Sequence, residues 1–202
     1  MPPTSLLAAL RDATAEQHAR TESVVPVLDP ALTLAGYAAI LRRFRAVYGA
    51  LEEVLARVEQ WPEGFDWTAR RKVPLLDRDL AWLASRGVIA DETIDVAGAT
   101  AAFPDVPALP EAIGMLYVLE GATLGGQLIA RRVGPRLGIT PDAGASFFAG
   151  MGEATGRRWR AFGAMADRWG ASHPEAWDRV AWSARATFHA IAAPFVESPV
   201  VP

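Results

Sequence analysis

The stretch LEGATLGGQLIA holds three glycines, Gly121, Gly125 and Gly126, among mostly apolar residues. A glycine inside a helix costs about 1 kcal/mol relative to alanine, so this cluster needs a reason. On a helix, Gly121 and Gly125 lie on one stripe with Gly114 and Val118. Such a stripe offers a shelf for a flat ligand, or a face where two helices approach closely.

A phosphate-binding loop is a further explanation of the glycines, and the flanking residues exclude it. That kind of loop follows a strand and ends in Lys-Ser or Lys-Thr. Here Gln127 and Leu128 follow the glycines, and the flanks 113–119 and 128–133 read as buried helix. Close helix packing and a flat ligand stay open.

The chain has three histidines, His18, His173 and His189. His173 precedes a proline at a predicted helix start, which favours a capping or loop role, and His189 fits a core or surface position. His18 shares one face of a predicted helix with Arg11, about 10 Å away along the axis. An imidazole can bind a metal and an arginine binds carboxylates, so the pair suits a ligand with a metal centre and an acidic edge. A purely structural role for His18 is the alternative.

Two groups of arginines accompany these residues. In GRRWRAF, Arg158 and Arg160 could hold an anionic edge of a ligand, or belong to a solvated face. Arg131, Arg132 and Arg136 follow the glycines and are interpreted as charges that offset the dipole at the end of that helix.

The elements that must position these residues are predicted to be helices. Apolar residues recur at steps of three and four along 34–58, with Thr33 as N-cap. A shorter helix is expected to begin at Thr4 or Ser5 and to include His18. The remaining predicted helices are one or two within 66–87, one from Pro110 through the glycines, one over about 153–169 and one over about 174–193.

No strand alternation or internal repeat is found, so the predicted fold is an all-α, single-domain bundle of six to eight helices. The domain is expected to span 1–202, with a core over about 5–193 and a loose C-terminal tail over 194–202.

Composition narrows the function classes. The 202 residues are 51% hydrophobic, without cysteine, and the formal net charge is −3. Disulfides and thiolate metal sites are therefore excluded, and nucleic acid is not an expected partner. No charge-free run reaches the roughly 18 residues of a membrane span, and the N-terminus lacks a basic signal region. We expect a cytoplasmic protein without a membrane anchor.

As a set, several segments resemble the haem oxygenase family in collinear order over about residues 5–190. They are ATAEQHARTE, YAAILRRFRAVYGALEE, VPLLDRDLAWL, LYVLEGATLGGQLI and SFFAGMGEATGRRWRAF. LYVLEGATLGG is similar to the bacterial branch that includes haem oxygenases associated with bacteriophytochromes. The resemblance implies a haem oxygenase-like helical fold.

The resemblance also implies roles for individual residues. His18 matches the proximal histidine, the axial ligand of the haem iron. Arg11 stands where family members place a basic residue near the propionates, and Tyr117 matches a tyrosine at the haem edge. Arg158 and Arg160 are further propionate candidates.

On the distal side, Gly121 and Gly125 match the glycines nearest the haem. Many family members follow the first of these glycines with an aspartate that orders water, and this chain has Ala122 there. A distal water network would then need another anchor, for which the candidates are backbone carbonyls, Glu120, Thr123 and Gln127.

The activity implied is the opening of the haem ring to biliverdin, CO and ferrous iron, with haem as both cofactor and substrate. It needs O2 and electrons from an external donor, a ferredoxin or flavin reductase, and the biliverdin could supply a bacteriophytochrome. The alternatives are a non-enzymatic haem-binding or haem-transfer protein, which Ala122 favours, and a purely structural bundle. A thiaminase-like enzyme would need a cysteine nucleophile, and the chain has none.

Overall fold

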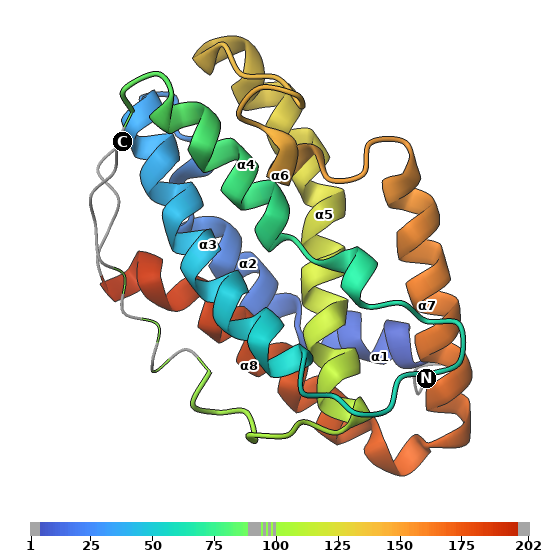
Figure 1. Cartoon of the computed structure of the whole chain (residues 1–202). Coiled ribbons are helices and arrows are strands. Elements are labelled where there is room, and N and C mark those ends of the chain that lie inside the picture. The colour runs from blue at the N-terminus through green and yellow to red at the C-terminus, as the bar shows by residue number, and fades with distance from the viewer. Residues whose placement is uncertain (1–4, 89–93, 95, 97, 99, 198–202) are drawn as a thin grey trace.

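The computed structural model describes residues 5–88, 94, 96, 98 and 100–197 (Figure 1). Within these residues the chain forms eight α-helices and no strand, which confirms the all-α prediction. Three short 3-10 turns join them: η1 (Pro26–Leu28), η2 (Thr68–Arg70) and η3 (Pro174–Ala176). The α-helices are α1 (Leu6–Ala13), α2 (Ala15–Val24), α3 (Leu34–Leu55), α4 (Val73–Ala84), α5 (Leu109–Leu137), α6 (Ser146–Ala149), α7 (Ala154–Ser172) and α8 (Trp177–Glu197).

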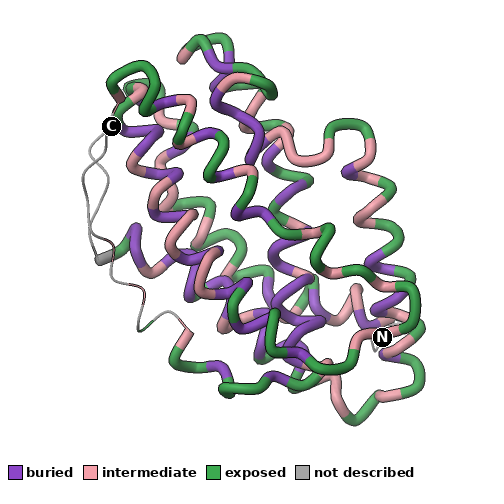
Figure 2. Tube along the Cα trace, in the orientation of Figure 1, coloured by how far each residue is buried: buried purple, intermediate pink, exposed green. Residues whose placement is uncertain are grey.

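Helix α5 is the centre of the bundle. It packs chiefly against α8 and also against α6 and α7, whereas α3 packs on α4 and α2 on α8. Buried positions follow one another along α3 and α5 in Figure 2. Between α3, α6 and α8 lies a cluster of aromatic rings with centroids 5.1–6.1 Å apart, made of Phe44, Phe147, Phe148 and Phe195.

Side-chain caps set several helix starts. The Thr33 hydroxyl accepts a hydrogen bond from the Gly36 amide at 3.1 Å, as predicted for this N-cap. Ser5 caps α1 in the same way, through the Ala8 amide at 3.3 Å. These bonds satisfy amides that have no partner inside their own helix.

The prediction of one continuous N-terminal helix is wrong, because the helix is interrupted at Thr14. Thr14 has φ −117° and ends α1, and α2 begins at Ala15. Its buried hydroxyl and its amide both donate to the Leu10 carbonyl oxygen, at 2.7 Å and 3.0 Å, and so complete the last turn of α1. Arg11 and His18 therefore lie on different helices, and their shared helical face does not exist.

The expected tail over 194–202 is wrong for its first part. Helix α8 continues through Pro194 to Glu197. Phe195 is 3% exposed, and Arg43 donates to the Pro194 carbonyl oxygen at 3.1 Å. The packing of this last turn outweighs the loss of one backbone hydrogen bond, which proline cannot make because it has no N–H. Residues 198–202 lie outside the described residues, and the single-domain boundaries stay a prediction.

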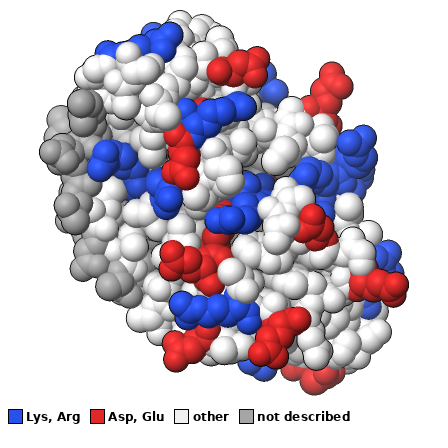
Figure 3. All heavy atoms as spheres, in the orientation of Figure 1, with Lys and Arg blue, Asp and Glu red and all other residues white. Residues whose placement is uncertain are grey.

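Among the described helices, α5 is long and apolar enough to cross a membrane by length and composition alone. Of its most apolar 18-residue stretch, 50% is buried inside the bundle, as in the core helix of a globular protein. On the face shown in Figure 3, positive and negative side chains are interspersed.

A buried carboxylate on α4 holds the start of α6. Asp79 is fully buried and accepts hydrogen bonds from the Ser146 amide at 2.8 Å, the Ser146 hydroxyl at 2.6 Å and the Phe147 amide at 2.8 Å. All three donors would stay buried without this carboxylate. The contact therefore fixes the aromatic side chains of α6 against the core.

We predict that Asp79→Ala lowers the free energy of unfolding by about 3 kcal/mol, because buried donors lose their acceptor. Asp77→Ala is the matched control on the same helix. Asp77 is half exposed and pairs with Arg45 at the surface, so its loss should cost less than about 0.5 kcal/mol. Urea unfolding followed by circular dichroism measures both, and equal effects would contradict the role of Asp79.

Candidate functional site

A cavity of about 580 Å³ lies among α2, α3, α5, α6 and α8, with Trp159 of α7 at its edge. This size suits a small-molecule or cofactor site. Most of the wall is apolar or aromatic. It is formed by Val25, Val27, Leu28, Phe44, Tyr48, Val118, Leu119, Leu128, Ile129, Phe147, Phe148, Phe188 and Ile191, besides the residues discussed below.

A larger hollow of about 770 Å³ lies along α8 beside Gln17, and no predicted site residue lines it. Gly98 is one of its lining residues, and most of the segment 89–99 is outside the described residues. The chemistry expected from the sequence therefore belongs to the smaller cavity.

Helix α5 presents the glycine cluster to the cavity. Gly121, Ala122, Gly125 and Gly126 all contribute to its wall. A Cβ built on Gly125 would meet nothing within 4 Å, and one on Gly121 would lie 3.7 Å from the Trp159 ring, an ordinary contact. Protein packing therefore requires neither Gly121 nor Gly125 to be glycine, and the missing side chains leave space in the cavity.

Two other glycines of α5 are packing residues. A Cβ on Gly114 would overlap the Val180 carbonyl oxygen of α8, and one on Gly126 would lie 2.7 Å from the Phe148 carbonyl oxygen of α6. At these positions α5 touches the backbone of its neighbours. Close packing therefore explains Gly114 and Gly126, and the flat-ligand explanation stays a prediction for Gly121 and Gly125.

His18 of α2 faces the same cavity. Its ring stands edge-on to Phe188 with centroids 5.7 Å apart, and its side chain is 59% exposed. Nδ1 lies 3.7 Å from a carboxylate oxygen of Glu22, one turn further along α2. A carboxylate at one ring nitrogen favours the tautomer that leaves the other nitrogen free as a metal ligand.

Tyr117 also lines the cavity, while Arg11 does not. Burial raises the pKa of the Tyr117 hydroxyl, and a hydrogen bond with the Thr14 side chain opposes this rise. Tyr117 is therefore a neutral hydrogen-bonding group at the interruption between α1 and α2. Arg11 is 75% exposed and pairs with the adjacent Asp12 at 3.1 Å.

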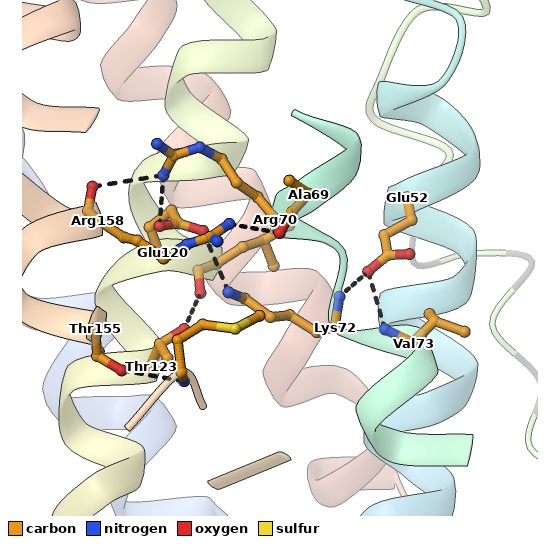
Figure 4. A network of polar contacts seen from close by, with 11 residues as sticks. Glu52, Ala69, Arg70, Lys72, Val73, Glu120, Thr123, Thr155 and Arg158 are labelled. Carbon is orange, nitrogen blue, oxygen red and sulfur yellow. Dashed lines mark hydrogen bonds and ion pairs between the residues drawn. The ribbon is translucent and has the colours of Figure 1, made fainter. Parts of the chain in front are cut away.

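The structure does not bring Arg158 and Arg160 to the cavity wall. Arg158 instead donates to the carbonyl oxygen of Ala69, the middle residue of η2 (Figure 4). Arg160 is exposed on α7. A role of Arg11, Arg158 or Arg160 in holding propionates stays a prediction.

Sequence reasoning missed Arg132 as a wall residue. It is exposed and lines the cavity near the end of α5. A signal was available, because Arg132 follows Gly125 by seven residues, or about two turns, and so shares its face. Taken alone, the sequence indicates Arg132 only as a charge at the end of the helix.

Lys72 was missed as well, and no local pattern indicates it. Its side chain is 4% exposed, lines the cavity, and reaches Glu120 of α5 with Nζ 3.2 Å from a carboxylate oxygen (Figure 4). Desolvation lowers the pKa of Lys72, and the Glu120 carboxylate opposes that shift. These two residues are 48 positions apart, so only the tertiary structure brings them together.

Comparison with known proteins decides the family. The family model described as "Heme oxygenase" matches residues 4–196 of this chain. The chain belongs to the haem oxygenase family.

A haem oxygenase of Xanthomonas campestris pv. campestris is 39% identical over 102 residues, which are 50% of this chain and 54% of that protein. The match thus spans about half the length of that curated relative. Two solved structures share the fold at 20% identity and 96% coverage of this chain. They are haem oxygenases from Leptospira interrogans, with TM-score 0.71 and full coverage of that chain, and from Neisseria meningitidis, with TM-score 0.65 and 92% coverage.

The residues present fit a haem. Aromatic and aliphatic walls suit an apolar macrocycle, and His18 offers an imidazole nitrogen inside the cavity. Arg132 places a cation on the same wall for carboxylates. Gly125, which has no packing partner at its Cβ position, leaves room for a flat ring against the backbone of α5.

We predict opposite effects at two adjacent glycines. In the ligand-free protein, Gly125→Ala should stabilise by up to about 1 kcal/mol, because alanine favours the helix and its Cβ meets no atom. Gly126→Ala should destabilise by about 1–3 kcal/mol, because its Cβ would collide with the backbone of α6. Thermal unfolding of both variants measures this difference. A destabilised Gly125→Ala protein would contradict the cavity assignment.

Proposed function

We propose that this protein is a haem oxygenase that binds haem in the cavity between α2 and α5. Haem would be opened to biliverdin, CO and ferrous iron with O2 and electrons from an external donor. The observation that carries the proposal is that His18 and the side-chain-free Gly125 face the same cavity in a chain of this family.

His18 would hold the haem by its iron. The Glu22 carboxylate lies 3.7 Å from Nδ1, and a closer approach would let it accept a hydrogen bond from Nδ1–H and leave Nε2 free for the metal. The edge contact with Phe188 limits rotation of the ring. When bound, the haem itself supplies the redox chemistry, because the iron takes up electrons and binds O2.

The glycines would set how closely α5 approaches the bound haem. Without side chains at Gly121 and Gly125, only the backbone of α5 borders this part of the cavity. A close wall restricts the space on that side of the ring and excludes bulk water. Ring opening rather than simple binding is favoured where a small ligand is confined against the ring edge.

The haem propionates would bind at the cavity wall beside Arg132. This guanidinium is the exposed cation among the described wall residues, where Lys72 is buried. Exposure keeps the propionate edge near solvent, which costs less than burying two carboxylates. Tyr117 offers a neutral hydroxyl at the same cavity.

Ala122 raises the question of what replaces the side chain of the usual aspartate. Of the anchors expected from the sequence, Gln127 donates to the Gly152 carbonyl oxygen at 2.6 Å and does not line the cavity. Thr123 lines the cavity and donates to the Leu119 carbonyl oxygen at 3.2 Å. Glu120 is directed to Lys72 and Arg70.

The wider role follows from the chemistry. A haem oxygenase needs a separate source of electrons, for which we propose a ferredoxin or flavin reductase. The similarity of Leu116–Gly126 to the bacteriophytochrome-associated branch supports biliverdin supply to such a photoreceptor, in the cytoplasm.

The test is to load the protein with haemin and to add reductant in air, with catalase present. We expect the Soret band to give way to biliverdin absorbance, with release of CO. A haem complex that survives these conditions unchanged would instead identify a haem carrier. Absence of a Soret shift when haemin is added would contradict both a haem oxygenase and a haem carrier.

His18→Ala tests the ligand assignment. We expect a changed haem spectrum and loss of ring opening, because the described cavity wall holds no second histidine. His189→Ala is the matched control, since His189 is exposed and lines the other hollow. An unchanged spectrum in His18→Ala would refute the assignment.

A further inference from the structure

Lys72 is a buried ammonium group with unused hydrogen-bonding capacity. An ammonium has three N–H donors. In the described part of the chain, the Lys72 Nζ has one hydrogen-bond partner, the Glu120 carboxylate at 3.2 Å. The side chain is 4% exposed and lines the cavity, so bulk water reaches it poorly. Buried donors need partners, and the cavity is where partners of Lys72 could come from.

The charges around Lys72 do not balance within the protein. Glu120 is shared with Arg70, whose guanidinium lies 2.7 Å from the second carboxylate oxygen. The Glu120 carboxylate therefore faces two cations, the buried Lys72 and the partly buried Arg70. Arg158 adds a further positive charge that lowers the pKa of both Lys72 and Arg70, after the larger contribution of desolvation. Asp66 is a further negative charge that interacts with Arg70 and Arg158, so three cations face two carboxylates in this group.

Glu52 does not neutralise the Lys72 ammonium. Its carboxylate accepts from the Lys72 backbone amide at 2.5 Å, the Val73 amide at 3.0 Å and the Arg71 guanidinium at 2.8 Å. These bonds fix the backbone at the start of α4 (Figure 4). Lys72 is thus held at its backbone by α3 and at its tip by α5, with little freedom to leave the cavity.

We propose that Lys72 is the charged hydrogen-bond donor of the haem cavity, and that it anchors the ordered water for which Ala122 has no side chain. The inference deepens the proposed haem oxygenase function and rests on it. Lys72 belongs to the wall that also holds Gly121, Ala122 and Gly125. Glu120 is a positioning residue, because it directs Nζ without lining the cavity itself.

A lysine at this place has a consequence that an aspartate would not have. Its ammonium would favour an anion or the negative end of a dipole in the cavity, and it can hold an ordered water through its remaining N–H groups. Tyr48, also on the wall, stays a neutral hydroxyl, because burial raises its pKa and the Glu52 and Glu120 carboxylates add to this rise. Lys72 is therefore the buried cationic donor among the described wall residues.

The test measures the affinity of sodium fluoride for the ferric haemin complex at pH 7. Fluoride binds ferric haem and accepts hydrogen bonds, so it reports a nearby donor without turnover. Loss of one charge-assisted hydrogen bond corresponds to at least about a tenfold change in affinity. We expect Lys72→Met to weaken fluoride binding by at least that factor. Lys72→Arg keeps a cationic donor and should weaken fluoride binding less than Lys72→Met does.

Two controls separate this role from general effects. Arg131→Met removes the same charge from an exposed residue of α5 that does not line the cavity, and should change fluoride affinity less than threefold, because solvent screens exposed charges. Imidazole, a neutral ligand, should bind Lys72→Met and the unmodified protein with similar affinity. Weaker binding of both ligands would mean a collapsed cavity and would overturn the proposal.

A merely structural ion pair makes a different prediction. If the Lys72–Glu120 contact were only structural, Lys72→Met would have a lower melting temperature but a fluoride affinity within twofold of the unmodified protein. An unchanged fluoride affinity of this kind would overturn the proposal. If Lys72→Met does not fold, Lys72→Gln replaces it, since an amide can keep the bond to Glu120 without the charge. Failure of the unmodified protein to bind haemin would refute the proposed function instead, so the two failures are distinguishable.

Discussion

The structure depends on the two places where α5 touches the backbone of its neighbours. At Gly114 it meets α8, and at Gly126 it meets α6, both too close for a Cβ. These contacts fix the position of α5 on either side of Gly121 and Gly125. The segment between them is therefore a rigid wall, and its missing side chains become free volume that neighbouring residues do not fill.

The second constraint is electrostatic. Glu52 of α3 and Glu120 of α5 are both buried, and both bind the chain around η2 and the start of α4. Burying carboxylates is costly unless each is fully hydrogen-bonded, and these two collect amide, guanidinium and ammonium donors. The same bonds that tie η2 and α4 to α3 and α5 carry Lys72 to the cavity, so one network serves both the fold and the site.

The features that could be predicted from the sequence are local ones. The 3.6-residue periodicity indicated α3, and the Thr33 cap is where it was expected. The two wrong predictions concern where helices end. At Thr14, the backbone leaves the helical conformation, with φ −117° and ψ 6°, although apolar periodicity continues through this position. At Pro194, packing of Phe195 and a bond from Arg43 continue a helix that proline alone would end.

The sequence by itself determined the helical class, the position of the glycine-rich helix and the candidacy of His18, because these depend on residue type and spacing along one segment. Only the tertiary structure decided which glycines pack and which face the cavity, because that depends on the helix lying opposite each of them. It also brought Lys72 to Glu120 across 48 residues. Charge pairing at such separation leaves no periodic signal, since it follows from how α4 and α5 are placed rather than from either sequence alone.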